Sequence, residues 1–328
     1  MHYKESKHIL QSIKAANRIL LTSHKEPDAD SAGSIIALHL GLKRLGIKTD
    51  LVCKDEVPKY LTFLPRYKQI RKVDFRSFNF RKYDLIITLD SSSWGQVVGS
   101  ELKENVPNLP IVVIDHHSSN KGYGKINLID KSATSVSEMI YKILIDWSVE
   151  IDSGIANNLL TGITGDTGSF RFPFINAETF EAAAALMKAG ADRDKIIYNL
   201  YFSVDLAELK YLSEVLKAAT VDKKDKIVWA AIPYKKYLKL GGPEGSGFAG
   251  AYFQVVKGTK IGILMIETES QKLEVSFRAR ENIDVSKISV LLGGGGHKKA
   301  AGVAIYGMKF EDAVEKVLET ARKYAKNA

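Results

Sequence analysis

Acidic and imidazole side chains stand directly after several short apolar runs of the chain, where they could bind a metal or transfer protons. Asp115, His116 and His117 follow the run at 111–114, and Asp90 ends another such run. Carboxylate oxygens together with imidazole nitrogens favour manganese, zinc, iron or magnesium over copper(I) or an iron–sulfur cluster. These residue types therefore predict a site for hard or borderline divalent cations.

Two further segments carry the same kinds of side chain. His24, Asp28 and Asp30 follow the first apolar run, and Asp166 lies in the stretch GDTG. Taken singly, Asp28 and Asp30 can cap the following helix, and Asp90 and Asp166 can form turns. If the carboxylates gather at one place they repel one another, and a bound cation removes that cost. The joint pattern favours metal binding, with enough ligands for two metals that share Asp90, as in phosphoryl hydrolysis.

The elements that must position these side chains alternate between strands and helices. Short β-branched runs predict strands at 18–24, 48–54, 83–90 and 111–117. A helical pattern at 31–46 separates the first two, and Gly46 ends it. This alternation predicts an α/β fold with a doubly wound, mostly parallel sheet and helices on both faces. Ligands bind beyond the carboxyl ends of such strands, which is where the acidic and imidazole residues stand.

The chain of 328 residues is long enough for two domains, and its character changes along its length. We expect a metal-binding catalytic domain at 1–190 and a helical, charged connector at 191–222. Strand patterns resume afterwards at 226–233, 260–270 and 272–280. Residues 223–328 are therefore expected to form a smaller α/β domain with a mixed sheet.

One strand of the second domain carries side chains suited to an anion. Ser276, Arg278 and Arg280 alternate along it and project to one face. Arg278 can make a bidentate contact with a phosphate or a similar oxyanion. A solvent-facing salt bridge is the alternative interpretation of this arginine.

A glycine-rich stretch, GGGGHKKAAG at 293–302, is a second candidate for anion binding. We expect it at the start of a helix, where backbone N–H groups and the helix dipole favour a negative charge. The residues expected to bind substrate there are Gly294, Gly295, Gly296 and His297. A flexible surface loop with a solvated lysine pair is the alternative.

Composition narrows the class of protein. The net charge of +9 suits nucleotides or nucleic acid as partners, although lysines can also simply solvate a surface. One cysteine, Cys53, excludes a disulfide framework and a thiolate metal cluster. No apolar run has transmembrane length, and the interrupted N-terminal pattern does not fit a signal peptide. We expect a cytoplasmic protein without membrane contact, for which a homodimer is a common default.

Several of these segments resemble those of a known family. HKEPDADSAGS, LDSSS, DHHSSN and GDTGSF are similar, in this order, to the four metal motifs of the DHH phosphoesterases. VSFRAR and GGGGHKKAAG resemble the arginine and glycine-rich motifs of the domain that usually follows, the DHH-associated domain. The resemblance covers both domains. Length and domain order are similar to those of the short bacterial group that degrades nano-RNA, 3′-phosphoadenosine 5′-phosphate, or linear and cyclic diadenylate.

The resemblance implies a role for each matched residue. Six ligands would hold two manganese ions bridged by Asp90: His24 and Asp28 at the first ion, and Asp30, His116 and Asp166 at the second. Magnesium, cobalt or iron are possible substitutes. Asp115 would orient a histidine ligand, and His117 would face the scissile phosphate as a hydrogen-bond donor or general acid.

Together these expectations describe a hydrolase of phosphodiester or phosphomonoester bonds that converts short nucleotides such as pApA to mononucleotides. Two metals would activate water in a cleft between the domains, and Arg278 with the glycine-rich stretch would hold the 3′-side nucleotide. Within hydrolases, the alternatives are an inorganic pyrophosphatase or a short single-strand exonuclease with the same metal site. Outside them, a nucleotide sensor would predict lost ligands, whereas every metal-motif position is present.

Overall fold

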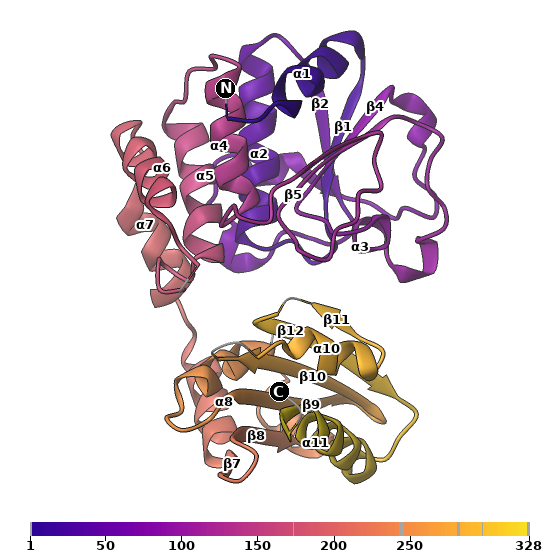
Figure 1. The fold of residues 1–328 in the computed structure, drawn as a ribbon, viewed down its shortest axis with the longest axis vertical. Helices are drawn as coiled ribbons and strands as arrows, with labels where there is room; N and C mark the ends of the chain where they lie inside the picture. Colours follow the sequence, from indigo (N-terminus) through magenta and orange to yellow (C-terminus); the bar gives the residue numbers. More distant parts are fainter. Residues whose placement is uncertain (1, 173, 243–245, 281–282, 297, 327–328) are drawn as a thin grey trace. The chain divides into compact units, whose positions relative to one another are not determined.

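Two compact units divide the chain (Figure 1), the first containing residues 1–203 and the second residues 204–328. The computed structural model describes residues 2–172, 174–242, 246–280, 283–296 and 298–326. The border between the units lies inside the predicted connector at 191–222. Of that stretch, α7 (Arg193–Ile197) packs within the first unit and α8 (Leu206–Lys217) within the second.

The first unit is built on a six-stranded sheet in the order β3-β2-β1-β4-β5-β6, with every neighbouring pair parallel. Its strands are β1 (Ile19–Ser23), β2 (Thr49–Cys53), β3 (Ile70–Lys72), β4 (Leu85–Leu89), β5 (Ile111–Asp115) and β6 (Ile126–Ile129). β1, β4 and β5 are buried along their whole length, as strands covered on both faces must be. The predicted parallel sheet is confirmed, and β3 and β6 are additions to it.

Helices cover both faces of this sheet. Successive side chains of a strand point to opposite faces, so they pack alternately into two hydrophobic cores. Leu21 and Ile87 pack on the side of the long helices, whereas Leu20 and Ile86 pack with Trp94 and neighbouring aromatic rings on the other. The helices are α1 (Glu5–Ala15), α2 (Ala29–Arg44), α3 (Trp94–Val98), α4 (Val136–Asp146), α5 (Ser153–Asp166), α6 (Ala177–Lys188) and α7. The unit also contains four short 3₁₀ helices among its described residues and one π-helix. The 3₁₀ helices are η1 (Lys59–Leu61), η2 (Tyr67–Gln69), η3 (Phe80–Lys82) and η4 (Ser100–Leu102), and the π-helix is η5 (Tyr198–Phe202).

Glycines let α2 and α5 approach each other closely. A Cβ atom at Gly33 would collide with the carbonyl oxygen of Asn158, and one at Gly165 would lie 2.6 Å from the Cβ of Ala29. Neither position accepts a larger residue unless a helix moves. This contact places the first turn of α2 beside the last turn of α5.

The second unit contains a mixed sheet in the order β11-β12-β10-β9-β8-β7, in which only β8 and β9 pair in parallel. Its strands are β7 (Thr220–Asp222), β8 (Ile227–Ile232), β9 (Ile261–Glu269), β10 (Lys272–Ala279), β11 (Gly295–Gly296) and β12 (Ala300–Tyr306). Its helices are α8, α9 (Tyr234–Lys239), the 3₁₀ helix η6 (Ser246–Val255), α10 (Val285–Leu291) and α11 (Phe310–Lys326). The predicted mixed sheet is confirmed.

The prediction that the glycine-rich stretch begins a helix is wrong. The stretch follows the C-terminal end of α10 and continues into β11 and β12. The reason is the alternation that comes after it, since Ala301, Val303 and Ile305 are buried in the core while β12 pairs with β10. A helix dipole therefore does not favour an anion at this place. Within the described residues, no helix combines the length and the apolar character needed to cross a membrane.

Candidate metal centre

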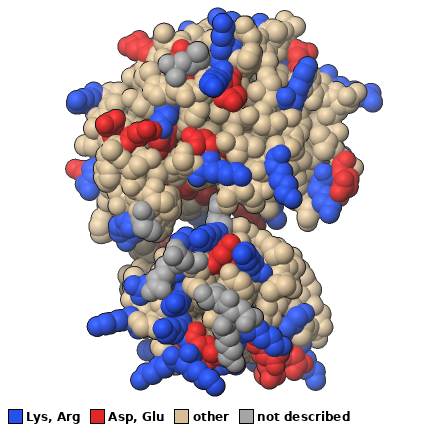
Figure 2. Space-filling view, in the orientation of Figure 1, with Lys and Arg blue, Asp and Glu red and all other residues tan. Residues whose placement is uncertain are grey.

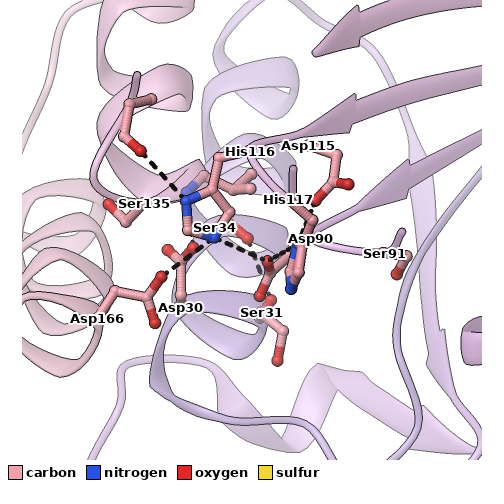
Figure 3. A network of polar contacts seen from close by, with 12 residues as sticks. Asp30, Ser31, Ser34, Asp90, Ser91, Asp115, His116, His117, Ser135 and Asp166 are labelled. Carbon is pink, nitrogen blue, oxygen red and sulfur yellow. Dashed lines mark hydrogen bonds and ion pairs between the residues drawn. The ribbon is translucent and has the colours of Figure 1, made fainter. Parts of the chain in front are cut away.

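Three neighbouring strands deliver polar side chains to one end of the parallel sheet (Figure 3). His24 follows β1, Asp90 follows β4, and His116 follows β5. Asp30 comes from the first turn of α2, and Asp166 is the last residue of α5. The close contact of α2 with α5 therefore brings these two carboxylates to the same rim.

All six predicted ligands meet at this rim. Groups whose potential ligand atoms lie within 4.8 Å of one another are His24–Asp28–Asp90, Asp30–His116–Asp166 and Asp90–His116–His117. The first group matches the first ligand set that the family resemblance implies, and the second group matches the second set except that it lacks Asp90. Asp90 also belongs to the third group, together with His116.

A backbone contact orients the His24 imidazole so that its Nε2 faces two carboxylates. Its Nδ1 lies 2.6 Å from the carbonyl oxygen of Lys25, to which it can donate. Its Nε2 lies 3.4 Å from Asp90 Oδ2 and 3.8 Å from Asp28 Oδ1. Asp28 also caps α2, because its Oδ1 accepts from the N–H groups of Asp30 and Ser31. The capping and ligand interpretations of Asp28 are thus compatible.

Around His116 the same pattern recurs. Its Nδ1 lies 3.2 Å from the carbonyl oxygen of Ala133, and its Nε2 lies 3.2 Å from Asp166 Oδ2 and 3.6 Å from Asp90 Oδ1. Asp30 is completely buried, and its carboxylate accepts from two N–H groups at the start of α4. A backbone partner at Nδ1 leaves Nε2 as the ligand nitrogen, the usual device for fixing a metal-binding imidazole.

The electrostatics of the rim fit bound cations. Burial, together with the charge of Asp90, raises the pKa of Asp30 well above its usual value. Burial and the neighbouring carboxylates, Asp30 first, do the same to the pKa of Asp166. Asp90 is only 2% exposed, and its Oδ1 has no hydrogen-bond partner among the described residues. A divalent cation would supply that missing partner and neutralise the clustered charge.

Asp115 orients His117 rather than His116, the histidine that the family resemblance implies as a ligand. The Asp115 carboxylate is completely buried, accepting from His117 Nδ1 at 2.7 Å and from Asn120 Nδ2 at 2.6 Å. His116 has the Ala133 carbonyl at its Nδ1 instead. Although burial opposes it, the hydrogen bond that His117 donates to Asp115 raises the pKa of His117. Asn120 was not predicted, although it stands in the same DHHSSN stretch.

Comparison with known proteins identifies the family. Residues 18–163 match the DHH family, N-terminal domain, and residues 247–327 match the DHHA1 domain. The chain contains a DHH domain and a DHHA1 domain. The match confirms the predicted family and, with it, the predicted enzyme class, a hydrolase of phosphoester bonds.

Individual members of the DHH family resemble the chain over almost its full length. It is 28% identical to the bifunctional oligoribonuclease and PAP phosphatase NrnA of Thermus thermophilus, across 98% of this chain and 95% of the relative. The protein of the same name from Bacillus subtilis is 25% identical, across 96% and 98%. An exopolyphosphatase-related protein from Bacteroides fragilis has the same fold, with a TM-score of 0.89 at 23% identity across 98% and 96%.

In the DHHA1 domain, the structure brings Arg278 and Ser276 to one face of β10. Their neighbours on β12 are the small residues Ala300 and Gly302. Burial lowers the pKa of Arg278, whose guanidinium donates to the carbonyl oxygen of Phe277. In the part of the chain that the structure describes, no carboxylate forms an ion pair with this arginine, so the salt-bridge alternative is not observed there.

The glycine-rich stretch of the DHHA1 domain lies one strand away from Arg278. Gly295 and Gly296 form β11, which pairs with β12, and β12 pairs with β10. Gly294 has no room for a side chain, because a Cβ there would lie 2.5 Å from Ser289 Oγ and closer still to the Gly302 carbonyl oxygen. His297, the remaining predicted substrate contact, lies outside the described residues.

Proposed function

We propose that this chain hydrolyses short nucleotides to mononucleotides with two divalent cations, manganese foremost, bound at the rim of the parallel sheet. Nano-RNA such as pApA is the proposed substrate, and linear or cyclic diadenylate and 3′-phosphoadenosine 5′-phosphate share the same bond chemistry. The observation that carries the proposal is the position of Asp90. This buried carboxylate lies 3.4 Å from His24 on one side and 3.6 Å from His116 on the other, where a bridging ligand is needed.

The donor set supports the choice of metal. It combines carboxylate oxygens with imidazole nitrogens, and none of the ligand groups among the described residues includes Cys53, whose buried thiol lies 3.2 Å from Ser23 Oγ. Such donors suit manganese, with magnesium, cobalt or iron as substitutes. Two such ions, when bound, would lower the pKa of a water molecule and stabilise charge on the phosphoryl group.

Different side chains of the protein are assigned to metal binding and to contact with the substrate phosphate. Asp90 is placed to hold both sides of the centre, with His24 and Asp28 on one side and Asp30, His116 and Asp166 on the other. His117, fixed by Asp115, is placed to donate a hydrogen bond or a proton to an oxygen of the substrate phosphate. Its Nδ1 lies 3.5 Å from Asp90 Oδ1, so the imidazole stands at the edge of the metal centre.

Substrate binding is the part we assign to the DHHA1 domain. A desolvated guanidinium at Arg278 suits a phosphate, because an anion would compensate the cost of burying its charge. Ser276 and the backbone of Gly294 to Gly296 are proposed to contact the same nucleotide. Two observations favour short substrates. The relatives named above are an oligoribonuclease and PAP phosphatase. On the face of the first unit that Figure 2 shows, Lys and Arg are also interspersed with Asp and Glu rather than forming a continuous basic track.

A substrate panel tests the proposal. The purified protein is incubated with manganese and pApA, cyclic diadenylate, 3′-phosphoadenosine 5′-phosphate or pyrophosphate, and the products are separated by chromatography. We expect mononucleotide from pApA at the highest rate. Rapid hydrolysis of pyrophosphate with none of the nucleotides would establish the pyrophosphatase alternative. Equal rates on two-mers and twenty-mers would contradict the preference for short substrates.

A further inference from the structure

One short segment, residues 133–137 at the start of α4, makes backbone hydrogen bonds to two members of the second ligand group, His116 and Asp30. The carbonyl oxygen of Ala133 lies 3.2 Å from His116 Nδ1. The N–H groups of Val136 and Ser137 donate to the two carboxylate oxygens of Asp30, at 2.6 Å and 2.8 Å. His116 comes from the end of β5 and Asp30 from α2, so the segment 133–137 supports both of them.

This segment is itself fixed by a buried carboxylate that the proposed chemistry does not use. Glu138 is 0% exposed, and its Oε2 accepts from Thr134 Oγ1 at 2.6 Å and from Thr179 Oγ1 at 2.9 Å. Its N–H group donates to Ser135 Oγ, the cap of α4. Thr179 belongs to α6, so Glu138 connects the segment to a helix that contributes no ligand.

Among the described residues, Lys142 is the cation that pairs with the charge of Glu138. Lys142 Nζ lies 2.8 Å from Glu138 Oε1 and 2.7 Å from Glu178 Oε2. The Glu178 carboxylate is exposed and, in the described structure, accepts a hydrogen bond from Lys142 but from neither threonine hydroxyl, whereas Glu138 is enclosed. A buried ion pair is often replaceable by apolar residues without loss of stability. An apolar side chain here, however, could not hold Thr134 and Thr179 at the same time.

We propose that Glu138 is a positioning residue for the second metal subsite. It acts through Thr134 and Thr179 on the segment 133–137, and through that segment on the ring orientation of His116 and the carboxylate of Asp30. The proposal rests on the metal centre of the proposed function and adds the outer residues that hold its second half in place. Outer partners of this kind change metal affinity about 10- to 100-fold when they are lost.

Calorimetric titration of the metal-free protein with manganese chloride tests this without any substrate. We expect the wild-type protein to bind two equivalents. Thr179→Val keeps the side-chain volume and removes the hydroxyl, and Glu138→Gln removes the charge. Both variants should weaken one equivalent about tenfold or more. Thr179→Ser restores a hydroxyl and should bind as the wild type does. Glu178→Gln is the matched control, because it removes the exposed partner of the same lysine and should leave both equivalents unchanged.

The outcomes separate the two levels of the proposal. A wild-type protein that does not bind two equivalents overturns the metal centre and this inference with it. If the wild-type protein binds two equivalents and Thr179→Val binds manganese with unchanged affinities, only the proposed role of Glu138 is overturned. Weakening by Glu178→Gln equal to that by Glu138→Gln would also overturn that role. Unfolding midpoints of the metal-free proteins are measured in parallel. If Glu138→Gln does not fold, Thr179→Val and Thr179→Ser decide the question. A purely structural role would lower the midpoint in Thr179→Val without selective loss of one equivalent.

Discussion

His117 Nδ1 and Asp115 Oδ1 lie 2.7 Å apart at the end of β5, and the Asp115 carboxylate is completely buried. The hydrogen bond fixes the imidazole ring and favours its protonated form. Neighbouring His116 is held by a backbone carbonyl instead. Two adjacent histidines therefore have different partners, which suits one to metal binding and the other to a contact with the substrate.

Asp115→Asn tests this division between the two histidines. The amide cannot stabilise the imidazolium, so we expect kcat to fall about 100-fold or more while metal content stays at the wild-type level. Asp115 raises the pKa of His117, so its removal lowers that pKa. If the protonated imidazole is the active form, activity in the variant should fall at a lower pH than in the wild type. Steady-state kinetics across pH and metal analysis provide the measurements. Loss of metal in this variant would assign Asp115 to the metal centre instead.

Asp90→Ala and Arg278→Ala separate chemistry from substrate binding. Removing the shared carboxylate should abolish hydrolysis and weaken binding of both ions. Removing the guanidinium should raise KM for pApA about tenfold or more and leave metal content intact. Kinetics with metal analysis of both variants gives the result. If Arg278→Ala lost metal as readily as Asp90→Ala, the assignment of substrate binding to the DHHA1 domain would be wrong.

Gly162→Ala should damage the metal centre from within α5. A Cβ at this position would lie 2.7 Å from Asp30 Oδ1 and would collide with Ser137 Oγ. We expect a loss of about 1–3 kcal/mol in the free energy of unfolding and weaker manganese binding. Gly154→Ala in the same helix is the control, because its Cβ would first meet the side chain of Asp152 at 3.2 Å. Denaturant unfolding and metal titration of both variants give the comparison, and equal effects would contradict the packing argument.

Stabilisation by manganese should increase as pH rises from about 5 to 7, because metal binding requires deprotonated ligands. Burial and neighbouring charge raise the pKa values of Asp30 and Asp166 in the metal-free fold. A raised folded pKa means that the folded state binds more protons than the unfolded state. The contribution of these two groups to stability therefore falls as pH rises above the unfolded value of about 3.9. Bound manganese reverses this by replacing the protons. Thermal unfolding with and without manganese measures the shift, and a shift independent of pH would show that neither carboxylate is a ligand.

Much of the candidate centre follows from local sequence. The runs before His24, Asp90 and Asp115 are short and largely apolar, which predicts buried parallel strands, and ligands collect where such strands end. Residue type alone then indicated the kind of metal. The glycine-rich stretch was misplaced because glycines carry no periodic apolar signal, and the alternation that reveals β12 begins only after them.

The amino-acid sequence by itself determined the parallel sheet, the set of candidate ligands and the end of the sheet where they meet. Only the tertiary structure decided which partner each of them has. Asp115 turns to His117, the Ala133 carbonyl reaches His116, and Thr179 meets Glu138 across 41 residues of chain. The physical reason is that strand ends and ligand types are set by neighbours in sequence. The direction of a side chain is set instead by the packing of helices that are distant in sequence, here α2, α4, α5 and α6.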